Sequence, residues 1–123
     1  MNSYLIAAAV ASFGVFALHT FVGGPIHAKA LLEASDIHPV PKYTNYYCWH
    51  LVTISLLLMA GCFGWAAIYP SGIELAWLAQ IQTVAYCLRS LSLVTMKKQN
   101  FLLMPQWILF LGIGILGGAG LAA

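Results

Sequence analysis

Apolar residues gather in four long segments that are separated by polar or helix-breaking residues. A helix needs about 20 mostly apolar residues to cross a bilayer, and each segment is close to that length. The pattern therefore predicts an all-α protein, a single-domain transmembrane four-helix bundle covering residues 1–123. The predicted helices cover about residues 3–21, 46–69, 73–95 and 105–121.

Glycine, proline and lysine mark the ends of these segments. Gly23-Gly24-Pro25 is expected to stop the first helix, and Pro70-Ser71-Gly72 the second. Lys97-Lys98 follows the third helix. Pro105 suits the first position of the fourth, because a helix leaves the N–H there unbonded and proline has none.

Two loops follow from these ends, over about residues 22–45 and 96–104. Within the first loop, residues 25–34 fit either a short helix lying at the membrane interface or irregular chain. The prolines at 39 and 41 favour extended chain after it, because a proline biases the preceding residue away from helix.

The composition supports a membrane location. Hydrophobic residues make up 62% of the chain and charged residues only 7%, whereas soluble domains carry about 25% charged residues. The net charge of +2, with no basic cluster, argues against nucleic acid as a partner. The three cysteines lack C-x-x-C spacing, so no disulfide framework is expected. No Lys or Arg precedes the first segment, so we expect a retained helix rather than a cleaved signal.

The positive charges indicate an orientation. Four crossings place both loops on one side of the membrane and both termini on the other. The loops contain every lysine, and Arg89 lies near the loop-side end of the third segment. Lys and Arg accumulate in cytoplasmic loops, so we expect both loops to be cytoplasmic and both termini external, or periplasmic.

Polar side chains recur near the cytoplasmic ends of the segments. Residues three or four apart share a helix face, and ionisable groups in lipid normally turn toward the protein interior. We therefore predict one inward pocket lined by His19, Tyr46, His50, Tyr86, Arg89 and Gln106. The alternative is that Arg89 extends to the surface while each histidine bonds a backbone carbonyl.

Several ligands suit such a pocket. His19 and His50 resemble the axial pair of a haem, with Arg89 available to a propionate. A quinone or another small lipid-soluble molecule fits the same Tyr, His and Arg side chains. A metal ion on His19 and His50 is less favoured, because a structural site needs about four ligands and the nearby guanidinium repels cations.

Glycines in the fourth segment indicate close helix packing. Gly114 and Gly118 have G-x-x-x-G spacing, which lets two helix backbones approach closely in lipid. This packing occurs either within one bundle or in a homo-oligomer or larger membrane complex. The lipid bilayer is a partner in each of these hypotheses.

No nucleophile with a paired base is found, and no catalytic residue is predicted. The three carboxylates, Glu33, Asp36 and Glu74, lie in or near loops. We therefore expect a non-enzymatic accessory or self-associating membrane subunit whose pocket stabilises the bundle or binds a small ligand. The alternatives are a redox or cofactor-binding protein and, with less support, an oligomeric channel or transporter, which usually needs an intramembrane acid.

Three stretches carry a resemblance over nearly the whole chain. They are His19-Thr20-Phe21 with Gly23-Gly24, the run from Lys42 to His50, and the run from Met104 to Phe110. In these the chain resembles small four-helix inner-membrane proteins of bacteria. The resemblance implies a shared fold and a multi-pass location in the bacterial inner, or cytoplasmic, membrane. It implies no activity.

Overall fold

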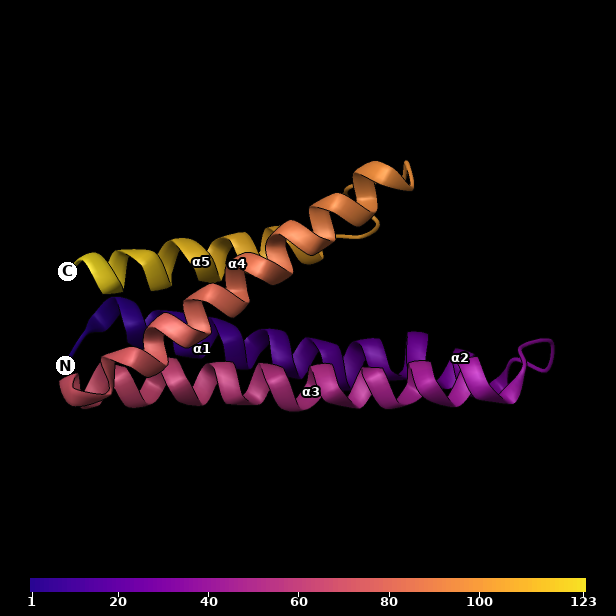
Figure 1. Cartoon of the computed structure of the whole chain (residues 1–123), viewed down its shortest axis with the longest axis horizontal. Coiled ribbons are helices and arrows are strands. Elements are labelled where there is room, and N and C mark those ends of the chain that lie inside the picture. The colour runs from indigo at the N-terminus through magenta and orange to yellow at the C-terminus, as the bar shows by residue number, and fades with distance from the viewer.

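The computed structural model describes residues 1–123 and is helical almost throughout (Figure 1). One continuous helix joins α1 (Ser3–Ala17), the π-helical segment η1 (Leu18–Ala28) and α2 (Lys29–Glu33). The other long helices are α3 (Pro39–Ile68), α4 (Ile73–Met96) and α5 (Gln106–Ala122), with the short 3₁₀ turn η2 (Pro70–Gly72) before α4. The all-α class and the four helices are as predicted.

The first helix does not stop at Gly23-Gly24-Pro25, as the sequence had indicated. The chain widens into η1, where the Lys29 N–H donates to the carbonyl of Gly24, five residues earlier. Proline in an ordinary α-helix crowds the carbonyl four residues before it, and a π-helical turn is wider. Pro25 is therefore accommodated inside the helix, and the predicted loop over 22–45 shrinks to residues 34–38.

The helix α3 begins at Pro39 rather than near Tyr46. Pro39 and Pro41 lie in its first turn, where backbone N–H groups have no partner within the helix. The N-cap is His38, whose Nδ1 accepts from the Val40 N–H at 3.3 Å. The prolines therefore start this helix instead of preceding it. The predicted limits of α4 and α5 differ from the observed ones by only a residue.

The four helices form two antiparallel pairs, α1 with α3 and α4 with α5 (Figure 1). Both termini lie at one end (Figure 1), which we call the termini end; Asn2, Ala67, Ile73 and Ala123 lie together there. At the opposite end, the loop end, the chain passes from α2 to α3 and from α4 to α5. Figure 1 shows α4 running obliquely away from α3 toward the loop end. The bundle is therefore joined at the termini end and splayed at the loop end.

The hydrophobic core lies between the helices and takes in few residues. Only 20 of 123 residues are buried, so most apolar side chains cover the outside of the molecule. The buried side chains are mainly small or aliphatic, and the buried aromatic ones are Phe63 and Phe110. The buried residues include Leu5, Ala8, Leu56, Met59, Phe63, Ala66, Ala67, Ala76, Ala79 and Ile113.

Two of the four helices have both the length and the hydropathy for crossing a membrane. They are Ser3–Glu33 and Pro39–Ile68, with 17% and 28% of their most apolar windows buried inside the protein. A core helix of a soluble protein would be mostly buried, and these are mostly uncovered. The polar side chains of α4 keep it out of this group, and α5 is a shorter apolar helix.

Candidate functional site

The predicted site residues fall into separate groups, and the first surrounds Trp49. The His19 ring stacks on the Trp49 indole, with ring centroids 3.9 Å apart and planes at 18°. His27 approaches the same indole at 6.0 Å. A Cβ added to Gly23 would lie 3.0 Å from Trp49 Cη2, so the indole rests on bare backbone. The segment η1 therefore forms a cradle around the Trp49 ring, and this contact joins η1 to α3.

The hydrogen bond of His19 belongs to the same contact. Its Nε2 lies 3.2 Å from the Trp49 carbonyl oxygen, which also accepts from Thr53 Oγ1 at 3.1 Å. This is the arrangement in which a histidine bonds a backbone carbonyl, which the sequence had left as an alternative. Thr20, beside His19, keeps a buried hydroxyl oxygen without a hydrogen-bond partner.

His50 and Tyr46 form a second group on α3. Their rings meet edge to face at 4.6 Å, Tyr46 is half-buried and His50 is exposed. His50 precedes Ser55, which contacts α4, by five residues, so the two side chains point about 140° apart around the helix. His50 consequently points away from α4 and from Arg89.

A third group joins α3 to α4. Ser55 Oγ lies 2.5 Å from the Tyr86 hydroxyl, and Gln82 Nε2 donates to both Ser55 Oγ and, at 3.2 Å, Tyr86 OH. The Tyr86 ring also packs edge-on against Phe110 of α5 at 5.2 Å. These polar groups satisfy one another in the interior, so they hold the helices together rather than line an open cavity.

The predicted convergence into one pocket is not observed. Arg89 and Gln106 are exposed, and neither side chain has a hydrogen-bond or ion-pair partner. Arg89 follows Gln82 by two helical turns on one face of α4, but α4 has by then diverged from α3 (Figure 1). The sequence spacing shows correctly which residues share a face of one helix. It contains no information on the angle between two helices.

The same geometry bears on the metal and haem hypotheses. Nowhere do three or more His, Cys, Asp or Glu side chains gather closely enough to hold a metal ion. Trp49 occupies one face of His19, and His50 points elsewhere, so the two imidazoles do not face each other as an axial pair. A haem between them would require Trp49 to move.

Gln80 is a polar residue in mid-helix that was not part of the predicted pocket. Its Nε2 donates to the Gly114 carbonyl of α5 at 2.9 Å, and its Oε1 is buried without a hydrogen-bond partner. A Cβ at Gly118 would lie 3.6 Å from the same amide. The G-x-x-x-G face therefore packs against α4 within one chain. An amide inside an apolar helix most often bonds a neighbouring helix, as this one does.

An apolar groove runs between α1 and α5 on the outer surface. Its volume is about 440 Å³, and it includes Gly14 and Gly112, at which an added Cβ would meet nothing within 4 Å. The remaining lining is aliphatic: Ala11, Val15, Leu18, Ile108, Leu109, Ile113 and Leu116. The groove is thus a hydrophobic feature of the outer surface of the bundle.

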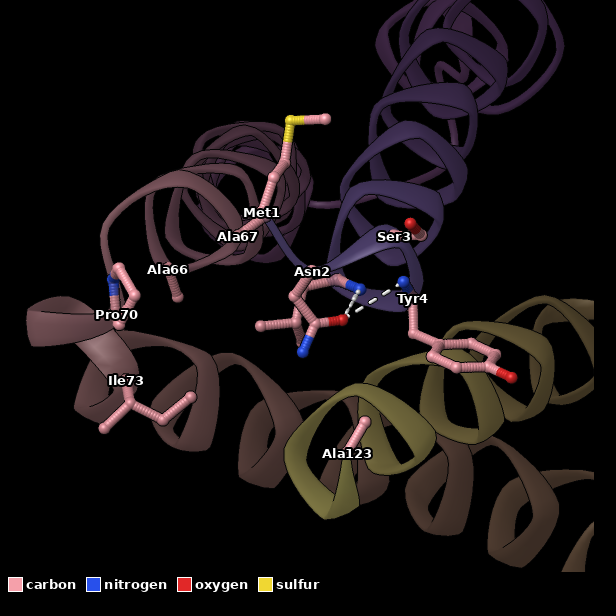
Figure 2. A pocket seen from close by; sticks show the side chains of 10 residues that line it. Met1, Asn2, Ser3, Tyr4, Ala66, Ala67, Pro70, Ile73 and Ala123 are labelled. Atoms are coloured by element: carbon pink, nitrogen blue, oxygen red, sulfur yellow. Dashed lines mark hydrogen bonds between the residues drawn. The ribbon is translucent and has the colours of Figure 1, made fainter.

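A second depression of about 570 Å³ lies at the termini end (Figure 2). Asn2 dominates it: its side chain caps α1 by accepting from the N–H groups of Tyr4 and Leu5, and its Nδ2 donates to the Gly120 carbonyl at 2.7 Å. The Asn2 backbone N–H donates to the Ala67 carbonyl at 2.9 Å. One residue therefore ties α1, α3 and α5 together. An Asn just before an apolar run is a recognisable N-cap signal, although its reach to α5 is not.

No protein-family model matches the chain, and neither a curated protein nor a solved structure matches it. The residues themselves are therefore the basis for a functional proposal. They comprise polar side chains that are hydrogen-bonded between helices, an apolar groove with open glycines, and charged side chains at the loop end.

Proposed function

We propose that the chain is a non-enzymatic accessory subunit of the bacterial inner membrane that associates with a second copy of itself inside the bilayer. All four helices cross the membrane in this proposal, with both termini outside and both loops in the cytoplasm. The observation that carries it is the apolar groove between α1 and α5, which contains glycines that the single chain does not need.

The location in the membrane is supported by what the surface exposes. Large apolar side chains are exposed along every long helix, for example Phe13, Leu58, Leu78 and Ile115. In water such a surface would aggregate, since soluble monomers rarely expose apolar patches larger than a few hundred Å². The lysines all lie near the loop end, which favours a cytoplasmic position for that end.

The glycines support association. A glycine inside a helix destabilises it by roughly 0.5–1 kcal/mol relative to alanine. Gly14 and Gly112 carry this penalty, yet each has room for a Cβ, and no glycine in the chain has a positive φ that would require it. In lipid, small residues allow a neighbouring backbone to approach closely. A backbone outside the chain would explain both positions.

A second copy fits the groove because the groove supplies both halves of a self-complementary contact. Beside the open glycines stand protruding aliphatic side chains, among them Leu18 and Ile108, which are 50% and 46% exposed. In a two-fold symmetric interface the same patch serves both partners, so the aliphatic side chains of one copy would fill the glycine positions of the other.

The test is chemical crosslinking of the full chain in native membranes, with a reagent that does not react with cysteine. Gly14→Leu and Gly112→Leu fill the groove and are expected to abolish the dimer band while the protein still accumulates in the membrane. Gly61→Leu is the matched control, because a Cβ at Gly61 also meets nothing within 4 Å and α3 does not line the groove. A dimer that survives both groove variants, or is lost equally in the control, contradicts the proposal.

Ligand binding is the alternative function, and the cradle around Trp49 is the feature that supports it. Long π-helical stretches are rare and often occur at functional sites, and His19 and His27 both lie on this one. A haem would give the purified protein a Soret band, and a bound quinone would appear in its extracted lipids. Reconstituted flux measurements would test the channel or transporter reading.

A further inference from the structure

The turn that joins α4 to α5 combines free positive charge with exposed apolar side chains. Lys97 and Lys98 directly follow α4, and the exposed Phe101, Leu102 and Leu103 come a few residues later, before the partly buried Met104. Leu102 and Leu103 are 78% and 81% exposed, so nothing in the chain covers them. Neither the groove nor the cradle around Trp49 accounts for this turn.

The length of α5 indicates where these apolar side chains lie. The helix has 17 residues, which at ~1.5 Å per residue is about 25 Å, and the hydrocarbon core is about 30 Å thick. If α5 crosses the membrane, the missing few ångströms are supplied by the apolar residues next to it. The loop-end turn supplies large apolar side chains directly before α5, among them Phe101, Leu102 and Leu103.

The turn is built to hold this position. Asn100 Oδ1 accepts from the N–H groups of Leu102 and Leu103 at 2.8 and 3.2 Å. The Trp107 indole N–H donates to the Phe101 carbonyl at 3.0 Å, and the two rings meet edge to face. The backbone polar groups are thus bonded within the turn, while the two leucines point outward. Tryptophan at this depth is also the usual residue of a membrane interface.

The two lysines have no partner within the chain. The single salt bridge joins Lys29 to Glu33 in the other loop region, and Lys42 Nζ donates to the Leu32 carbonyl. No carboxylate lies near the α4–α5 turn in sequence, and the side-chain amines of Lys97 and Lys98 make no hydrogen bond. This turn therefore leaves a net positive charge directly beside exposed apolar side chains.

We propose that Lys97–Met104 is an interfacial anchor that binds the phosphates of anionic lipids in the cytoplasmic leaflet. Leu102 and Leu103 insert at the boundary of the acyl chains, and Lys97 and Lys98 contact the headgroups. Anionic lipids attract lysines near the membrane surface, and apolar side chains beside them add insertion energy. This inference rests on the membrane location proposed above.

The test uses the full chain, extracted from membranes only after it has resisted carbonate washing. It is reconstituted in nanodiscs of phosphatidylcholine mixed with phosphatidylglycerol, and native mass spectrometry counts the lipids that stay bound. The wild-type chain is expected to retain phosphatidylglycerol preferentially. Lys97→Gln with Lys98→Gln is expected to reduce that preference roughly tenfold or more.

Lys29→Gln with Lys42→Gln is the matched control, since it removes the same charge from side chains that already have partners. The control is expected to keep the preference. An unchanged preference in the Lys97 and Lys98 variant, or an equal loss in the control, overturns the inference. A chain released by carbonate would instead refute the membrane location itself, so the two failures are distinguishable.

A second measurement covers the apolar half of the anchor. A fluorophore attached to Leu103→Cys, with the native cysteines replaced by serine, is expected to be quenched by shallow lipid-linked quenchers and protected from aqueous iodide. Strong quenching by iodide alone would place the turn in water and contradict the anchor.

Discussion

The termini end and the loop end of this bundle are built from similar helices and are held together differently. At the termini end, Asn2 (Figure 2) bonds both α3 and α5. Leu5 packs so tightly on Gly120 that a Cβ added there would lie 2.6 Å from the Leu5 side chain. Toward the loop end, the last polar contacts between the pairs are those of Ser55 with Gln82 and Tyr86, and beyond them contacts such as that of His19 with Trp49 stay within one pair.

The difference shows how polar side chains are accommodated in an apolar helical protein. Each of the hydrogen-bonded groups finds a partner on its nearest neighbour: His19 on α3, Gln82 on α3, and Gln80 on α5. Because these local partners suffice, nothing draws Arg89 and His50 into a common site. Convergence of polar residues in sequence therefore does not require convergence in space.

The largest expected effect lies at the tightly packed end. Gly117→Ala would place a Cβ 2.9 Å from the Phe63 ring and against Gln80 Oε1, so we expect destabilisation by about 3 kcal/mol. Gly112→Ala, at an open position, is the control and should stabilise the monomer by roughly 0.5–1 kcal/mol. Unfolding in mixed micelles with rising SDS measures both; equal shifts would contradict the difference in packing.

The next effect concerns the hydrogen bonds at the termini end. Asn2→Ala removes the cap of α1 and the bond to Gly120, so we expect a loss of about 1–2 kcal/mol in the same titration. Asn45 offers the comparison, because its Nδ2 bonds only the Pro41 carbonyl within α3. Asn45→Ala should change stability by less than about 0.5 kcal/mol.

The cradle at the loop end should be less sensitive. His19→Leu removes a stacked ring and its bond to the Trp49 carbonyl, and we expect a loss of about 1 kcal/mol. His50→Leu, at an exposed position, should have a smaller effect. A larger loss from His50→Leu would indicate that His50 has an interior partner after all.

The smallest effect is expected between the pairs. Tyr86→Phe removes the hydroxyl that bonds Ser55 and Gln82, and interhelical bonds in membranes average about 0.6 kcal/mol. Tyr47→Phe is the control, because the Tyr47 hydroxyl is exposed and makes no hydrogen bond. A loss of stability several times larger for Tyr86→Phe would mean that the hydrogen bonds among Ser55, Gln82 and Tyr86, rather than the hydrophobic core, hold the two helix pairs together.

The helices were largely predictable, and their limits were predictable where the breaking residues act locally. Pro70-Ser71-Gly72 and the Lys97-Lys98 turn end helices as expected. Gly23-Gly24-Pro25 does not, because Trp49, remote in sequence, packs onto Gly23 and the helix widens to admit Pro25. A tertiary contact of this kind leaves no trace in local spacing.

The site was predictable only helix by helix. Gln82 and Tyr86 do share a face, and His19 does bond across to α3. The angle at which α4 diverges from α3 (Figure 1) depends on packing between helices, which the spacing within one helix does not encode. Asn2 was missed because capping reveals the helix start and not the two helices it reaches.

The splay itself can be measured directly by pulsed electron paramagnetic resonance in bilayer nanodiscs, with the native cysteines replaced by serine. One spin-label pair, Ser3→Cys with Glu74→Cys, spans α1 and α4 at the termini end; the other, Thr44→Cys with Thr95→Cys, spans α3 and α4 at the loop end. We expect a narrow, short distance distribution for the first pair and a clearly longer one for the second. Equal short distances at both ends would contradict the splay, and would bring His19, His50 and Arg89 back within reach of one another.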